Sequence, residues 1–343
     1  MRNKIAFLLI FLISIAFAIP PYLGAIKAAR PVHGQDGWEV VTPEGAGMDS
    51  DSLAQAGGYL KKTDATAFIV LSKGKIVWEQ YFRGQTPNDY AFAFSTANLL
   101  LSAITGISIA RGELPPEGRL MDFYPEFFTR AGNKNGLLEE TAALTVGKVT
   151  LRQILANTSG LKNPKEEYFH QVDWIQWMLS QKITGKPGET FLPAPLATYL
   201  VSGAITRQTG KRASELAYER ICRPVKMNRV IWHSGPENYD IGGQYLYMRP
   251  LDIARLGQLY LHGGQEIIPK AWVQETLACG FGLGIRNIKG YRVFTTEGED
   301  TAPNLYMVPE RGLVVVVTSY AGIFRESLSY KHVEKVLADY LLQ

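Results

Sequence analysis

Hydrophobic and polar positions divide the chain into strands near both ends and helices between them. An apolar run at 67–71, the turn Ser72-Lys73-Gly74 and a second strand-like segment at 75–82 predict a β-hairpin. From 95 to 112, apolar residues recur at helical spacing, and Arg111-Gly112 supplies a last-turn cation and a C-cap glycine. The sequence therefore predicts a long, largely apolar helix directly after the hairpin.

The segment from about 113 to 265 is predicted to be mostly helical, with loops rich in proline and glycine. Strands are expected again near the C-terminus. The remaining expected elements are helices at 49–62, 151–157, 173–181, 197–208, 213–222, 250–262 and 326–342, and strands at 281–286, 290–296, 305–308 and 313–319. This order predicts an α/β fold of the α+β type. One antiparallel sheet is built from the N- and C-terminal segments, is flanked by helices and carries an inserted all-helical subdomain.

The N-terminus has the pattern of a targeting segment. Arg2 and Lys4 precede an apolar run at 5–19, and a small-residue site for cleavage lies within its last residues. Residues 1–19 are therefore predicted to be a signal peptide, with an uncleaved membrane anchor as the alternative. Residues 20–37 are expected to be a linker and 38–343 the folded domain, located in the periplasm or elsewhere outside the cytoplasm.

Composition excludes several classes of function. Hydrophobic residues make up 46% and charged residues 20%, which is typical of a globular protein and not of a disordered one. The net charge of +4 is spread along the chain without a basic run, so we expect no nucleic acid partner. Cys222 and Cys279 match no zinc pattern, and whether they pair in a disulfide stays open. No P-loop, EF-hand or H-E-x-x-H motif occurs, so no metal or cofactor is expected.

Ser95 stands where the long helix begins, and two roles are open for it. As an N-cap, its hydroxyl would accept a hydrogen bond from a free backbone N–H of the first turn. As a nucleophile, it would lie in the positive field at the helix N-terminus. Ser72 and Lys75 also spell S-x-x-K, but they lie in the hairpin turn without a helix behind them, so we expect no catalysis there.

Eight stretches carry a family resemblance in a fixed order. They are Phe68–Phe82, Ser95–Gly112, Leu120–Glu126, Val149–Leu161, Lys186–Phe191, Gly242–Met248, Asp252–Tyr260 and Tyr306–Arg311. Together they resemble the serine β-lactamase and penicillin-binding-protein-like superfamily over roughly residues 38–342. The branch they resemble holds class C β-lactamases, related esterases and nylon-oligomer hydrolases. The resemblance implies a β-lactamase/transpeptidase-like fold whose helical subdomain spans about 113–265.

The resemblance also implies a set of site positions. The family uses S-x-x-K at a helix N-terminus, a tyrosine on a loop of the helical subdomain, and a strand motif ending in glycine. Ser95 occupies the nucleophile position, but Asn98 stands at the lysine position and Pro193 at the tyrosine position. Thr296-Glu297-Gly298 keeps the glycine of the strand motif, which implies that an oxyanion hole is retained at Gly298.

These substitutions decide the expected function. An amide does not titrate near neutral pH, and proline has no acid/base group. The chain is therefore expected to be a cell-envelope serine hydrolase relative that acts on amide or ester bonds through Ser95, with weak or lost activity. The alternative is a non-catalytic binding module for a cell-wall peptide, a small acyl ligand or a protein partner.

Four further side chains are candidate site residues. His170 and His233 lie in loops of the helical subdomain and could replace a lost base, although such histidines are usually solvated. Tyr245 and Tyr247 belong either to the core or to the cleft.

Overall fold

The computed structural model describes residues 37–93, 95–128, 145–162, 170–296, 304–320 and 328–342. Residues 36–343 form one compact unit. The predicted signal peptide or anchor at 1–19 and most of the predicted linker lie outside the described residues. Within the described ranges, no helix combines the length and the apolar character needed to cross a bilayer.

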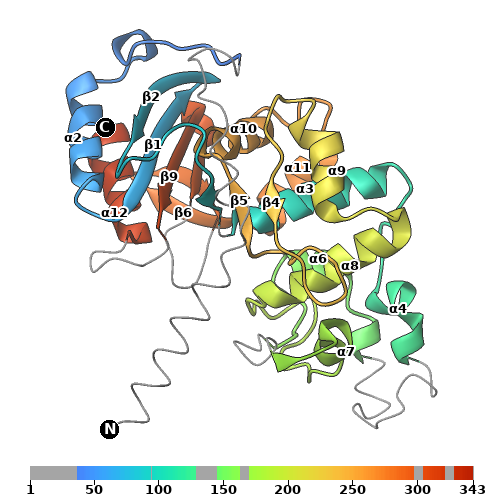
Figure 1. Cartoon of the computed structure of the whole chain (residues 1–343). Coiled ribbons are helices and arrows are strands. Elements are labelled where there is room, and N and C mark those ends of the chain that lie inside the picture. The colour runs from blue at the N-terminus through green and yellow to red at the C-terminus, as the bar shows by residue number, and fades with distance from the viewer. Residues whose placement is uncertain are drawn as a thin grey trace, which may run out of the picture. The chain divides into compact units, whose positions relative to one another are not determined.

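A six-stranded antiparallel sheet organises the unit, with strand order β2-β1-β9-β8-β7-β6 (Figure 1). Its strands are β1 (Ala65–Ser72), β2 (Lys75–Tyr81), β6 (Gly284–Ile288), β7 (Tyr291–Thr295), β8 (Leu305–Val308) and β9 (Leu313–Ser319). The N-terminal hairpin therefore pairs with strands from the C-terminal segment through β1 and β9. The predicted fold class is confirmed.

Strands β1 and β9 are buried along almost their whole length because both faces of the sheet are covered. Phe68 and Val70 of β1 belong to a core beneath α2 (Ser50–Leu60) and α12 (Tyr330–Val336). Ile69 and Leu71 point to the opposite face and join the core built around α3 (Thr96–Ala110). Successive side chains of a strand alternate between faces, so a continuous apolar run supplies two cores at once.

The helices and the smaller elements complete the unit. The remaining α-helices are α4 (Leu120–Phe123), α6 (Leu151–Leu155), α7 (Trp174–Leu179), α8 (Thr198–Thr209), α9 (Ala213–Ala217), α10 (Pro250–Leu261) and α11 (Lys270–Cys279). Short 3-10 turns lie at Glu44–Ala46, Pro125–Phe128, Pro195–Ala197 and Pro309–Arg311, and π turns follow α9 and α12 at Tyr218–Cys222 and Leu337–Leu341. A second sheet of three short strands has the order β3 (Ala91–Phe92), β5 (Leu246–Met248) and β4 (Ile231–Trp232).

Three parts of this arrangement differ from the sequence-based expectation. The small sheet was not predicted, because strands of two or three residues are too short to show a period. Helix α11 was also missed, and the first C-terminal strand was placed three residues too early. These last two errors fall on neighbouring segments, where Gly280, Gly282 and Gly284 interrupt the apolar pattern.

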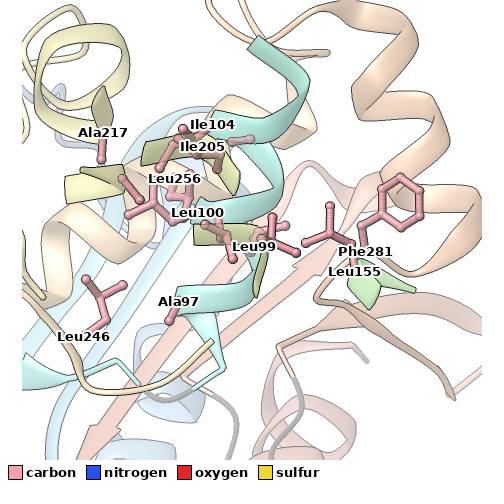
Figure 2. Packing of buried hydrophobic residues seen from close by; sticks show 14 of the residues in the cluster. Ala97, Leu99, Leu100, Ile104, Leu155, Ile205, Ala217, Leu246, Leu256 and Phe281 are labelled. Carbon is pink, nitrogen blue, oxygen red and sulfur yellow. The ribbon is translucent and has the colours of Figure 1, made fainter. Parts of the chain in front are cut away.

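Helix α3 lies at the centre of the larger core. Figure 2 shows its residues Ala97, Leu99, Leu100 and Ile104 among side chains from several other elements. The helix is buried on nearly all sides, which explains its high apolar content. At Gly106 the ring of Trp272 from α11 approaches so closely that a Cβ would lie 2.3 Å from it. This packing fixes the helix that directly follows Ser95.

Candidate active site

Ser95 immediately precedes α3 but does not cap it. Its backbone has φ −69° and ψ −6°, which are helical values and not the extended values usual for an N-cap. The side chain makes no capping hydrogen bond, and the half-buried hydroxyl has no hydrogen-bond partner among the described residues. Its carbonyl accepts the N–H of Asn98 at 3.0 Å. The hydroxyl is therefore available for other chemistry.

Asn98, one turn further on, is held between two glycines. A Cβ on Gly243 would lie 1.8 Å from Oδ1 of Asn98, and a Cβ on Gly282 would lie 2.7 Å from its carbonyl carbon. Oδ1 is buried and has no hydrogen-bond partner within the described part of the chain. Asn98, the residue predicted to stand at the family's lysine position, is thus a closely packed neutral amide.

Pro193 lies on a loop that is fixed by Asn157. The N–H of Leu192 donates to the carbonyl of Asn157 at 2.7 Å, and the N–H of Ala194 donates to its Oδ1 at 3.5 Å. Asn157 has φ +57°, the left-handed conformation that asparagine tolerates better than most residues. These contacts fix the residues on both sides of Pro193, and its assignment to the family's tyrosine position stays a prediction.

Tyr199 is the tyrosine that follows this loop, and it lies in helix α8. Its side chain is buried, and its hydroxyl donates to Oε2 of Glu237 at 2.6 Å. Burial, with the neighbouring Glu237, raises the pKa of Tyr199 far above its ordinary value. The phenol is thus occupied in a structural hydrogen bond.

A cavity of about 290 Å³ joins Asn98 to the loop that carries Pro193. Its polar lining includes the amides of Asn98 and Asn157, while Phe191 is 65% exposed and Ile285 is 42% exposed. Ser95 is not one of the lining residues. The remaining lining comes from the α11–β6 region: Ala278, Cys279, Gly280, Gly282, Leu283, Gly284 and Arg286.

Sequence reasoning missed the α11–β6 wall of this cavity. The signal that could have revealed it is a glycine at every second position from 280 to 284. Gly282, at φ +71°, also lets the chain pass close to the backbone of α3. The pattern therefore marks a close backbone approach.

The predicted strand motif begins beside the start of α3. The hydroxyl of Thr96 donates to that of Thr296 at 3.4 Å, and both residues are buried. Glu297 and Gly298 lie outside the described residues. The contact therefore places the end of β7 at the start of the helix, and the role of Gly298 stays a prediction.

An aromatic cluster lies on the small sheet just before Ser95. The ring of Tyr247 lies 5.2 Å from that of Phe92 and 5.6 Å from that of His233, and the ring of Tyr245 is about as near to both. All four side chains are half-buried. Burial lowers the pKa of His233 and raises the pKa of Tyr247. The cluster is a partly accessible aromatic surface that leads into the start of α3.

The other candidate residues lie apart from this site. His170 is exposed, and Ser72 pairs with Lys75 at the end of the hairpin, where Lys75 forms an ion pair with Glu39 at 2.8 Å. Both cysteines are free thiols. Among the residues that the structure describes, no group of three His, Cys, Asp or Glu side chains could hold a metal ion.

Comparisons with known proteins agree with the fold. A search of curated proteins gave no match. A Bacillus anthracis protein described as a 6-aminohexanoate-dimer hydrolase is 19% identical, with TM-score 0.64 and coverage of 83% of this chain and 80% of that one. The octameric penicillin-binding protein homologue from Pyrococcus abyssi is 15% identical, with TM-score 0.66 and coverage of 85% and 77%. The penicillin-binding protein from Bacillus halodurans is 12% identical, with TM-score 0.64 and coverage of 83% and 99%.

These structural likenesses support the fold, and a sequence family model gives the family. The Beta-lactamase family model matches residues 51–323, which include Ser95 and the segments that form the cavity. The predicted resemblance is thereby confirmed: this chain belongs to the beta-lactamase family of serine hydrolases.

Proposed function

We propose that the protein binds amide- or ester-containing ligands at the Ser95 site and hydrolyses them slowly or not at all. The observation that carries this proposal is the environment of Asn98. A neutral amide, packed against Gly243 with its oxygen buried and unpaired in the described structure, occupies the position of the family's proton acceptor. We also propose that no other side chain acts as the proton acceptor in place of Asn98.

The residues at the two proton-transfer positions limit the rate that the site can reach. A positioned general base contributes about 10²–10⁴ to a rate. Groups that act as one catalytic unit are not additive, so losing one costs nearly as much as losing all. Here both proton-transfer positions are substituted, by Asn98 and Pro193. Binding and an oxyanion hole alone would leave roughly 10³–10⁴ over water, which is far below an ordinary hydrolase.

The cavity indicates the class of ligand. The lining includes the amides of Asn98 and Asn157, whose NH2 groups can donate hydrogen bonds to the carbonyl of a peptide or ester group. Phe191 and Ile285 offer exposed apolar surface for an acyl chain or an apolar side chain. A cell-wall peptide or a small acyl compound fits this lining. The predicted targeting segment at 1–19 would bring the site to the cell envelope, either released there or anchored by that segment.

Calorimetric titration tests the binding part of the proposal. Penicillin G and N-acetyl-D-alanyl-D-alanine would be titrated separately into the full chain and into Phe191→Ala, with Val172→Ala as the matched control. Val172 is 90% exposed and does not line the cavity. We expect saturable binding of at least one probe, weakened about tenfold or more by Phe191→Ala and unchanged by Val172→Ala. No saturable binding of either probe, or equal affinity in all three proteins, would refute the proposed cavity.

The second candidate function is a slow hydrolase that uses Ser95 with a non-standard base. The observation that favours it is the Ser95 hydroxyl, which is not used to cap α3. Covalent modification of Ser95 by the activated probe p-nitrophenyl acetate, followed by release of the acyl group, would favour this candidate. Intact-protein mass measured over time on the wild type and on Ser95→Ala distinguishes the two.

A further inference from the structure

The small sheet of β3, β5 and β4 has one face in the larger core and one face turned away from it. Trp232, Leu246 and Met248 are buried and belong to that core. Successive side chains of a strand point to opposite faces, and directly paired residues share a face. Tyr247 lies between Leu246 and Met248, so it points away from the core together with Phe92, its partner on β3.

His233 and Tyr245 extend this aromatic cluster beyond the ends of β4 and β5. The N–H of His233 donates to the carbonyl of Tyr245 at 3.1 Å, so the pairing of the two strands continues past Leu246. The ring of Tyr245 lies 6.2 Å from that of Phe92 and 6.3 Å from that of His233. All four rings of the cluster are half-buried and keep some exposed surface.

Tyr245 has a backbone conformation that a bulky residue rarely adopts. Its φ of +54° lies in the left-handed region. Such conformations cost free energy, and they cluster at active sites and ligand clamps. Two residues earlier, Gly243 packs against the side chain of Asn98. One short segment thus contacts Asn98 and supplies a strained tyrosine to the aromatic cluster.

The cluster adjoins the candidate nucleophile. Phe92 precedes Ser95 by three residues, so their Cα atoms are at most about 11 Å apart. The N–H of Ala93 donates to the carbonyl of Leu246 at 2.8 Å, and the N–H of Thr96 donates to the carbonyl of Ala93 at 2.9 Å. These bonds tie the start of α3 to β5. A ligand held at Ser95 would therefore lie within reach of the rings.

The chemistry of the cluster favours an uncharged planar group. Burial lowers the pKa of His233, so its imidazole is neutral at neutral pH. Burial raises the pKa of Tyr247, so its phenol stays protonated. Aromatic rings prefer offset or edge-to-face partners with centroids about 4.5–7 Å apart, and their faces carry negative potential. An aromatic group can make such contacts, whereas an anion would be repelled by the ring faces.

We propose that the aromatic cluster is a subsite for an aromatic ring on the acyl part of the ligand. The Ser95 site then takes arylacyl amides or esters, and the cavity beside Asn98 receives the part of the ligand on the other side of the amide or ester bond. This inference rests on the proposed function and names the class of its ligand.

The test uses phenylacetamide and cyclohexylacetamide, two amides that differ only in whether the ring is aromatic. Both are titrated into the full chain, and the ring C–H signals of His233, assigned from His233→Gln, are followed by NMR. We expect saturable shifts with phenylacetamide and a dissociation constant on the order of 1–10 mM, as for a ligand of so few atoms. Cyclohexylacetamide is expected to bind at least about threefold more weakly, because it has no π system.

Three variants show whether the ring of Tyr245 makes the contact. Tyr245→Asn removes the ring at a φ that asparagine tolerates, and it is expected to weaken phenylacetamide binding about threefold to tenfold. Tyr245→Phe keeps the ring and is expected to stay within about twofold of the wild type. Tyr59→Ala, the matched control, removes a ring that lies 6.0 Å from that of His332 in the other core, and it is expected to leave the affinity unchanged. Equal affinity for the two amides, or an unchanged affinity in Tyr245→Asn, would overturn the proposal.

A ligand without a ring separates this inference from the proposed function. N-acetyl-D-alanyl-D-alanine carries no aromatic group, so its titration tests the Ser95 site without the aromatic cluster. Saturable binding of this dipeptide together with equal affinity for the two amides would refute the aromatic subsite alone. The absence of saturable shifts with phenylacetamide up to about 100 mM, well above the expected dissociation constant, would refute it as well.

Discussion

The close contact between Gly243 and Asn98 gives a sharp stability prediction. In Gly243→Ala the new Cβ would lie 1.8 Å from Oδ1, 2.5 Å from Cγ and 2.8 Å from Nδ2 of Asn98. Gly243 does not have a positive φ, so the backbone itself accepts alanine. All of the cost therefore comes from overpacking against one side chain, and we expect a loss of about 1–3 kcal/mol in the free energy of unfolding.

A double-mutant cycle isolates this contact. Asn98→Ala removes all three atoms that the new Cβ would meet, and it also removes a buried, unpaired carbonyl oxygen. On that background Gly243→Ala is expected to cost less than about 0.5 kcal/mol. The coupling free energy is then about 0.5–3 kcal/mol, measured by urea denaturation of the four proteins. Gly58→Ala, with open space at its Cβ, serves as the additive control.

The refuting result is a coupling below about 0.5 kcal/mol. It would mean that the Asn98 amide does not lie against Gly243. The claim that a packed neutral side chain fills the lysine position would then fail.

Three further predictions follow from individual contacts. Asn98→Lys alone is expected to raise the rate of p-nitrophenyl acetate hydrolysis less than about tenfold, because proline still stands at the predicted tyrosine position. A rise of about 10³ or more would show that the tyrosine position had been assigned to the wrong residue. Cys279 is exposed and is expected to react at once with a thiol reagent in the native protein. Cys222 is buried, and burial raises its pKa to about 12, so it is expected to react only after unfolding. Equally fast reaction of the two thiols would contradict this packing. Gly106→Ala is expected to lower the free energy of unfolding in urea by about 1–3 kcal/mol, because the new Cβ meets the tryptophan ring of α11. Gly58→Ala, with open space at its Cβ, is expected to raise that free energy by about 0.5–1 kcal/mol. Equal effects of the two substitutions would show that α3 is not packed so closely.

The fold could be predicted because its main strands and helices show long apolar patterns, each contained within one segment of the sequence. The hairpin of β1 and β2 and the helix α3 have apolar runs and terminal signals that do not depend on distant contacts. The small sheet is different, because β3, β4 and β5 owe their pairing to segments far apart in the chain. Such pairings leave no period in the sequence.

The site was predictable in its positions but not in its shape. Ser95, Asn98 and Pro193 could be placed by their order within the motifs, and their assignment to the family's site positions stays a prediction. Whether Ser95 caps the helix could be decided only from its backbone dihedral angles. The burial of Asn98 against Gly243 joins residues 145 positions apart, so no local pattern could have shown it.

The most direct test of the account is the steady-state rate of p-nitrophenyl butyrate hydrolysis by the wild type and by Ser95→Ala. Enzymes commonly turn over at about 1–10³ per second. We predict a wild-type kcat far below this range, and a kcat/KM within about tenfold of that of Ser95→Ala. A wild-type kcat within the ordinary range that Ser95→Ala abolishes would contradict the account.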